Sequence, residues 1–166
     1  HRQCLALEQQ DIPALIQWND TVLACRESYE LRLTDTALAD AMIRLLHGLS
    51  IETDLLKTLN DQSKKPHNIS YVTTFAIAAT HWRISPHYAA LGYAWAWLEN
   101  QVAAATKLTL FGQLSAQKAI DALMPVVEQA VSQSLLINDD DIGTSLPGLA
   151  MASSHHETQY SRLFRS

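Results

Sequence analysis

The stretch that decides the fold is residues 87–107, HYAALGYAWAWLENQVAAATK. Alanine, the residue with the highest helix propensity, recurs along it together with four aromatic side chains. A helix that is apolar on nearly every side is typical of the centre of a helical bundle. Its longest apolar run, residues 88–98, has 11 residues, whereas a membrane-spanning helix needs about 20. We therefore expect a buried helix in a soluble all-α protein that has no membrane contact.

Helical periodicity continues on both sides of this stretch. The apolar positions of residues 12–23 recur at i, i+3 and i+4, with Asn19 among them, and Asp11 is placed to cap a helix that runs on toward Leu31. The other predicted helices are residues 38–48, 55–59, 71–82 and 115–136. Pro125 predicts a kink or an early end in the last of these. No segment reads as a convincing strand, so the sequence predicts one helical bundle of about six or seven helices.

We predict that this bundle covers residues 1–142. The rest of the chain, residues 143–166, is predicted to be an irregular C-terminal tail of the same domain. The residues that disfavour a helix at its start are Gly143, Pro147 and Gly148. The apolar residues near its end, at i, i+3 and i+4, are Tyr160, Leu163 and Phe164. Such an element either docks back on its own bundle or inserts into a partner's groove, and the periodicity favours neither.

The composition limits the classes of function. Hydrophobic residues make up 48% of the chain and charged residues only 17%, which favours a surface that is partly buried against other proteins, although a compact monomer fits nearly as well. The net charge is −5 and the longest basic cluster is the pair at residues 64–65, so we expect no nucleic-acid partner. Two cysteines without metal-site spacing, Cys4 and Cys25, and the lack of a signal-peptide pattern favour reduced thiols in a cytoplasmic protein.

Catalytic and metal-site motifs are missing from the sequence. It contains no phosphate-binding loop, no dinucleotide fingerprint, no nucleophile elbow and no Glu-x-x-His pair for a di-metal centre. His155 and His156 are adjacent, without the spacing of a ligand pair, so solvent-exposed histidines are favoured over metal ligands. A weak metal site completed by a partner is the alternative for these two residues.

Several segments resemble one known family. DIGTSLP at residues 141–147 and HETQYSRLFRS at residues 156–166 are similar to the C-terminal signature of the UreF urease accessory proteins. Residues 97–107 resemble the family's central helix, and the resemblance runs from Asp11 to the last residue. Ala39 and Ala116 stand where the resemblance predicts glycine. The family's N-terminal Gly and Ser-Tyr motif has no counterpart before His1, so we expect a chain that lacks that segment.

The resemblance implies a non-catalytic chaperone in urease maturation. UreF proteins are all-α, often dimeric, and bind the accessory protein UreD, which is called UreH in some organisms. The pair recruits the nickel GTPase UreG and docks on apo-urease for nickel insertion, and modulation of the GTPase is a further role compatible with the resemblance. This implies that the complex handles nickel and that the chain holds no cofactor of its own.

The resemblance also implies which residues bind these partners. The residues expected to bind UreD are His156, Glu157, Thr158, Gln159, Tyr160, Ser161, Arg162, Leu163, Phe164, Arg165 and Ser166. The residues expected either to face UreG or to form an internal polar network are Glu99, Asn100, Gln101 and Lys107. A competing hypothesis is a helical enzyme or ligand carrier that uses the aromatic helix, residues 88–98, as the wall of a pocket.

Overall fold

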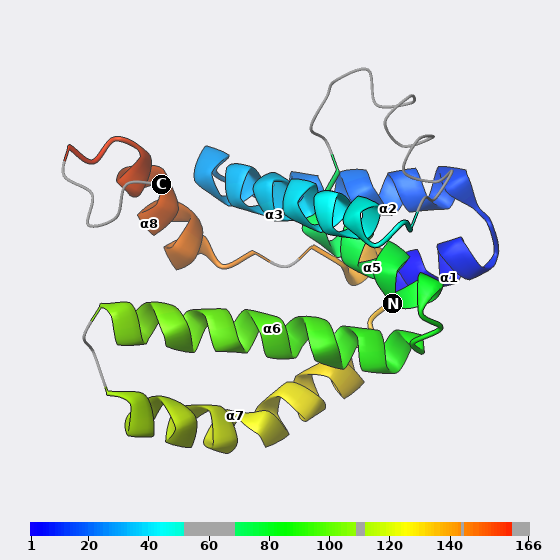
Figure 1. Ribbon diagram of the computed structural model, residues 1–166. Helices are drawn as coiled ribbons and strands as arrows, with labels where there is room; N and C mark the ends of the chain where they lie inside the picture. The colour runs from blue at the N-terminus through cyan, green and yellow to red at the C-terminus, as the bar shows by residue number, and fades with distance from the viewer. Residues whose placement is uncertain (52–68, 109–111, 144, 161–166) are drawn as a thin grey trace.

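The computed structural model describes residues 1–51, 69–108, 112–143 and 145–160 (Figure 1). Within these ranges the chain forms seven α-helices, one short 3-10 helix and no strand, which confirms the all-α prediction. The α-helices are α1 (Arg2–Glu8), α2 (Ile12–Ala24), α3 (Tyr29–Gly48), α5 (Tyr71–His81), α6 (Pro86–Lys107), α7 (Gln113–Ser134) and α8 (Pro147–Glu157). The helix predicted over residues 55–59 lies outside the described residues.

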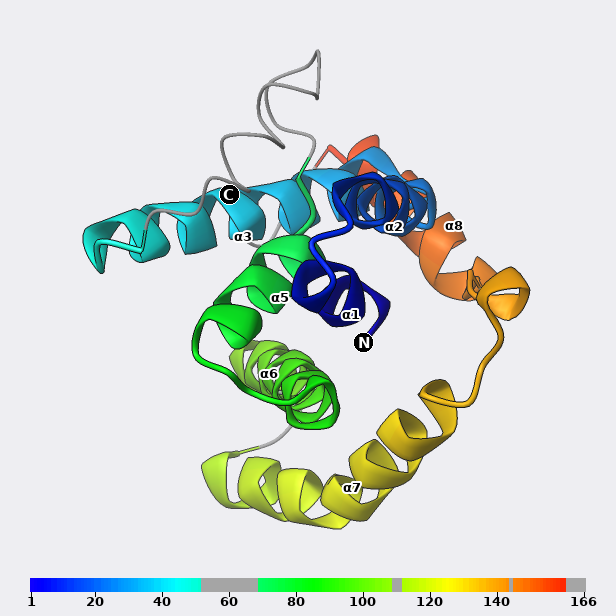
Figure 2. The same ribbon diagram turned by 90° about the vertical axis from the view of Figure 1, so that its right-hand side faces the viewer.

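Helix α5 is the centre of the main core. It contacts α1, α2, α3 and α6, and Figure 2 shows it enclosed by α1, α3 and α6. Its buried positions include four consecutive small or medium side chains, Ala76 to Ala79, which let the neighbouring helices approach closely. Leu15 of α2 and Leu46 of α3, both fully buried, pack into the same cluster. The main core therefore forms around α5.

The aromatic helix α6 is not the buried centre, contrary to the sequence prediction. Only Ala89, Leu98 and Val102 of its residues are buried, while Tyr88 is 68% and Trp97 59% exposed. The physical reason is that α6 packs mainly against α5 and α7, so much of its circumference faces outward. Many of the apolar side chains of α6 therefore lie on the surface of the protein and not in its core.

Helices α6 and α7 form a hairpin with a second, smaller core (Figure 1). Leu98 and Val102 of α6 pack against Ala116 of α7 there, with Ile120 and Val127 at its edge. Pro125 lies inside α7 without ending it, and Figure 2 shows the ribbon changing direction midway, as the kink prediction requires. Ala116 and Ala39 are both buried, so a residue one methyl group larger than glycine fits at these two positions.

The boundary between α2 and α3 was misplaced in the sequence prediction. The predicted cap at Asp11 is confirmed, since its Oδ1 accepts a hydrogen bond from the Ala14 amide at 3.0 Å. However, α2 ends at Ala24, and a new helix begins after Ser28, whose Oγ accepts a hydrogen bond from the Leu31 amide at 3.1 Å. A serine N-cap competes successfully with continuation of the helix. Helix α1 was also not predicted.

The predicted irregular tail contains a regular helix, α8, over residues 147–157. Proline at the first turn of a helix removes only an amide that has no intrahelical acceptor, so Pro147 starts the helix and does not break it. The residues after Gly148 include two alanines and one methionine and no further glycine or proline. Helix α8 lies against α3 (Figure 1). Among the described helices, none has the length and apolar character needed to cross a membrane.

Candidate partner-binding surfaces

The segment before α8 is held to the bundle by two arginine contacts. Arg2 of α1 donates from Nη2 to the Ile137 carbonyl oxygen at 3.0 Å, and its Nε pairs with the Asp139 carboxylate. Further along, the Ser145 hydroxyl donates to the Glu27 carboxylate. These contacts lead the chain from the end of α7 across to the start of α3.

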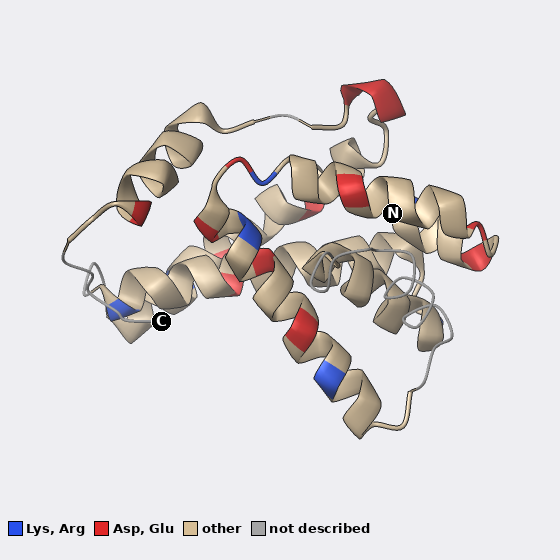
Figure 3. Ribbon diagram, turned by 90° about the horizontal axis from the view of Figure 1, so that it is seen from above, with Lys and Arg blue, Asp and Glu red and all other residues tan. Residues whose placement is uncertain are grey.

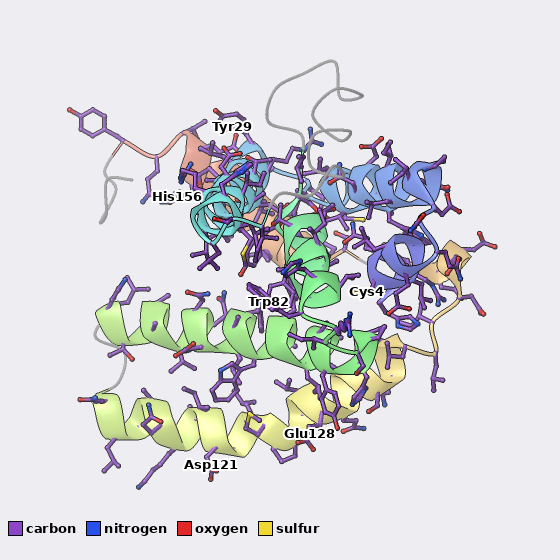
Figure 4. The ribbon with its side chains drawn as sticks, turned by 45° about the vertical axis from the view of Figure 1, so that its right-hand side comes forward. Cys4, Tyr29, Trp82, Asp121, Glu128 and His156 are labelled. Atoms are coloured by element: carbon purple, nitrogen blue, oxygen red, sulfur yellow. The ribbon has the colours of Figure 1, made fainter. Side chains whose placement is uncertain are left out.

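Helix α8 is fastened to the N-terminus of α3 by polar groups. The Ser28 and Ser153 hydroxyl oxygens lie 2.6 Å apart, and the Glu30 amide donates to Glu157 Oε1 at 3.3 Å. His156 Nδ1 lies 2.7 Å from Glu30 Oε2, and Figure 4 shows His156 beside this end of α3, where Tyr29 is labelled. A carboxylate at a helix N-terminus is favourable because the first amides of the helix carry partial positive charge. We call these five residues, Ser28, Glu30, Ser153, His156 and Glu157, the α8 latch.

Five of the eleven residues expected to bind UreD are described. His156 and Glu157 belong to the α8 latch, so their side chains already contact their own bundle. Thr158 ends the helix, Gln159 is exposed, and Tyr160 is fully exposed, at 105% relative accessibility. The other six residues, 161–166, lie outside the described part. The first two residues of the expected segment thus contact α3 from the surface, whereas Tyr160 is fully exposed.

The residues expected on the UreG side are all exposed on α6. Glu99, Gln101 and Lys107 lie on the surface, and Asn100 Nδ2 donates to the Ala96 carbonyl oxygen of its own helix, at 2.9 Å. The exposure of these four side chains favours a partner-facing role over an internal polar network. Their positions leave them accessible to a partner.

Large apolar side chains are exposed near these polar groups and elsewhere on the C-terminal half. Those at least half exposed between α6 and α8 are Tyr88, Trp97, Leu114, Val126, Leu136, Leu146, Leu149 and Met151. Exposed apolar surface of this kind is typical of protein–protein contact sites. Charged residues are sparse by comparison, and Figure 3 shows few basic residues in the described part. Two of them are neighbours, since Arg32 Nε donates to the Arg26 carbonyl oxygen at 2.9 Å.

A buried polar cluster joins α6 to the start of α3, and sequence reasoning missed it. Asp35 of α3 is 6% exposed; its carboxylate accepts hydrogen bonds from Arg26 Nη2 at 3.2 Å and from the Tyr71 amide at 3.3 Å. Burial raises the pKa of Tyr93 on α6, and the nearby Arg26 guanidinium lowers it less. An aspartate within an otherwise periodic helix was the available signal.

A second buried network centres on Asn19. Its Oδ1 accepts hydrogen bonds from the Ser70 amide and from Thr73 Oγ1, both at 2.9 Å, and Gln3 Nε2 donates to the same threonine oxygen at 2.7 Å. The position of Asn19 within an apolar stripe predicted its burial, although the pattern did not reveal its partners. This network joins α1, α2 and the N-terminus of α5.

Helix α6 also walls a cavity, as the competing hypothesis requires. The cavity has a volume of about 320 Å³ and lies between α1, α5, α6 and α7. Its lining is mainly small and apolar, with Ala90, Tyr93 and Ala94 from α6, and Gln3 is among its few polar groups. In the described part, Gln3 Oε1 is buried without a hydrogen-bond partner.

No candidate metal centre is found in the described residues, where no three histidine, cysteine, aspartate or glutamate side chains come together. His155 is exposed, and His156 contacts Glu30. Cys4 is buried and Cys25 partly buried, and both are free thiols. Burial raises the pKa of the Cys4 thiol.

Comparison with known proteins identifies one family. A model of the UreF family matches residues 1–124. The chain is 48% identical over 166 residues to the urease accessory protein UreF of Marinomonas sp. (strain MWYL1), which covers 99% of the chain and 69% of that relative. It is 45% identical over 156 residues to the urease accessory protein UreF of Chromohalobacter salexigens, covering 94% of the chain and 65% of the relative. The UreF of Psychrobacter cryohalolentis is 44% identical with the same two coverages. The chain thus spans about two thirds of the length of these relatives.

Proposed function

The chain belongs to the UreF family of urease accessory proteins, and from this premise we propose that it is a non-catalytic adaptor. In this proposal it binds UreD (UreH) and recruits the nickel GTPase UreG, so that the assembly docks on apo-urease for nickel insertion. Nickel is the cargo of the complex, and no residue of this chain is assigned to it.

One observation carries the UreD part of the proposal, namely the full exposure of Tyr160. A fully exposed tyrosine is available as an anchor, and buried aromatic side chains dominate the energetics of interfaces. The Arg2 and Glu27 contacts hold the segment before α8 at a defined place on the surface, well before the chain reaches Tyr160. This supports a tail that starts from a fixed point and ends in a partner's groove.

Substituting Tyr160→Ala tests the UreD part directly. We expect the dissociation constant for UreD to rise about thirtyfold, because removal of an aromatic anchor costs about 2 kcal/mol. The melting temperature should not change, since the Tyr160 side chain is fully exposed. The matched control is Tyr88→Ala, a 68% exposed tyrosine on α6 that should leave UreD binding intact. Equal UreD affinities of wild type and Tyr160→Ala, measured by biolayer interferometry, contradict the anchor role.

The UreG part of the proposal is carried by the exposed polar end of α6. Glu99, Gln101 and Lys107 are accessible there, next to exposed Trp97. We expect Lys107→Ala to reduce UreG recruitment by the UreD-bound chain and to lower urease activation in co-expression. The control is Lys118→Ala, an exposed lysine on α7. If Lys107→Ala leaves UreG recruitment unchanged, Lys107 is not part of the surface that binds UreG.

The competing function, small-molecule binding, has the cavity of about 320 Å³ in its favour. Gln3 Oε1 offers a buried acceptor at its wall. Ala94→Phe fills this space and distinguishes the two functions. If the chain is a ligand carrier the substitution abolishes urease activation, whereas an adaptor tolerates it as long as the melting temperature is retained.

A further inference from the structure

We propose that α8 is a switch: while the α8 latch holds it on α3, His156 and Glu157 are withheld from UreD, and full binding requires release of the helix. The inference rests on the proposed function, because UreD is the partner whose access is controlled. The new element is that the N-terminus of α3 competes with UreD for the same residues of α8.

The attachment of α8 is of a kind that a partner can replace. No residue of α8 is buried, and the contacts between it and α3 include three polar ones, from Ser153, His156 and Glu157. Each such hydrogen bond adds little net stability, because water takes the place of the lost partner when the contact opens. Apolar side chains of α8 that would fix it to a core, such as Leu149 and Met151, are 52% and 62% exposed instead. The helix is therefore docked without being part of the core.

The competition arises because the same side chains serve both states. His156 and Glu157 are the first two residues of the expected UreD-binding segment, and both contact Glu30 in this structure. The Glu30 carboxylate lies on His156, while its amide donates to Glu157, so both groups of Glu30 are engaged with α8. A partner that takes these two side chains must break both contacts. The docked helix and the bound partner then exclude each other.

A reversible disulfide tests this switch. The Ser28 and Ser153 hydroxyl oxygens are 2.6 Å apart, so Ser28→Cys with Ser153→Cys places two thiols within the range of a disulfide. Neither residue belongs to the expected UreD segment. The full-length double variant is compared, oxidised and reduced, with each single variant and with the wild-type chain, which controls for Cys4 and Cys25. The readout is the dissociation constant for purified UreD.

We expect oxidation to weaken UreD binding of the double variant about tenfold or more, because the locked state removes the binding-competent population. Reduction should restore the affinity of the single variants. Oxidised protein that binds UreD as tightly as reduced protein, or more tightly, overturns the switch, and so does a double variant that stays weak after reduction. If the wild-type chain itself fails to bind UreD, the proposed function fails, whereas indifference to the disulfide defeats the switch alone.

Discussion

At the scale of single residues, Tyr93 of α6 lies close to the ion pair of Arg26 and Asp35. The Arg26 and Asp35 side chains lie next to it, and burial raises the pKa of its hydroxyl. The unfolded chain ionises this tyrosine near its ordinary pKa of about 10, before the folded chain does. Its contribution to the free energy of unfolding is therefore fully present below pH 10 and is lost as the pH rises through the raised pKa.

This sign gives a prediction for alkaline unfolding. The free energy of unfolding of the wild-type chain, measured by urea titration, should fall as the pH rises above about 10. Tyr93→Phe should fall less over this range, because it has no proton to lose. Tyr88→Phe is the matched control, since Tyr88 is 68% exposed, and should fall as steeply as wild type. Parallel curves for Tyr93→Phe and wild type contradict the buried state of the Tyr93 hydroxyl.

The sequence predicted single residues where their role is local. Asp11 could be recognised as a cap because an N-cap acts on an amide three residues away. Asp35 could not, because its partners are Arg26, nine residues earlier, and the Tyr71 amide, 36 residues later. Long-range partners leave no periodic trace in the chain.

At the scale of elements, the hairpin of α6 and α7 depends on a small core of its own. Val102→Ala should lower the free energy of unfolding by about 2 kcal/mol, since Val102 is 7% exposed and its methyl groups fill the contact with α7. Val126→Ala is the same chemical change at a 54% exposed position of α7 and should cost less than about 0.5 kcal/mol. Equal losses for the two variants in chemical denaturation contradict the packing of the hairpin.

Elements were predicted well in kind and less well in place. Helical period and alanine content identified α5, α6 and α7 because these signals are internal to each helix. Which helix is central was predicted wrongly, because α5 and α6 are both apolar and only their neighbours decide which one is buried. Helix α8 was missed because Pro147 and Gly148 disfavour the interior of a helix, whereas both lie in its first turn, where proline is tolerated.

At the scale of the whole molecule, the chain has a core around α5, a hairpin that exposes apolar side chains, and a C-terminal segment fastened by polar contacts. A charged fraction of only 17% is explained by this distribution, because the exposed hairpin and α8 carry apolar groups where most surfaces carry charges. Sequence resemblance indicated the family, which the comparisons confirm. The residues that meet the partners stay predictions, and the six at the chain's end lie outside the described part.

The central claim is that the segment after α8 binds UreD while the bundle, including α8, folds without it. Its most direct test is the UreD affinity of a chain that ends at Thr158, compared with the full chain of 166 residues. Because α8 ends at Glu157, the shortened chain keeps the α8 latch and should melt at the same temperature. We predict that it loses at least about thirtyfold in UreD affinity, since it lacks Tyr160 and every apolar residue beyond it. An unchanged melting temperature together with unchanged UreD affinity would contradict the account.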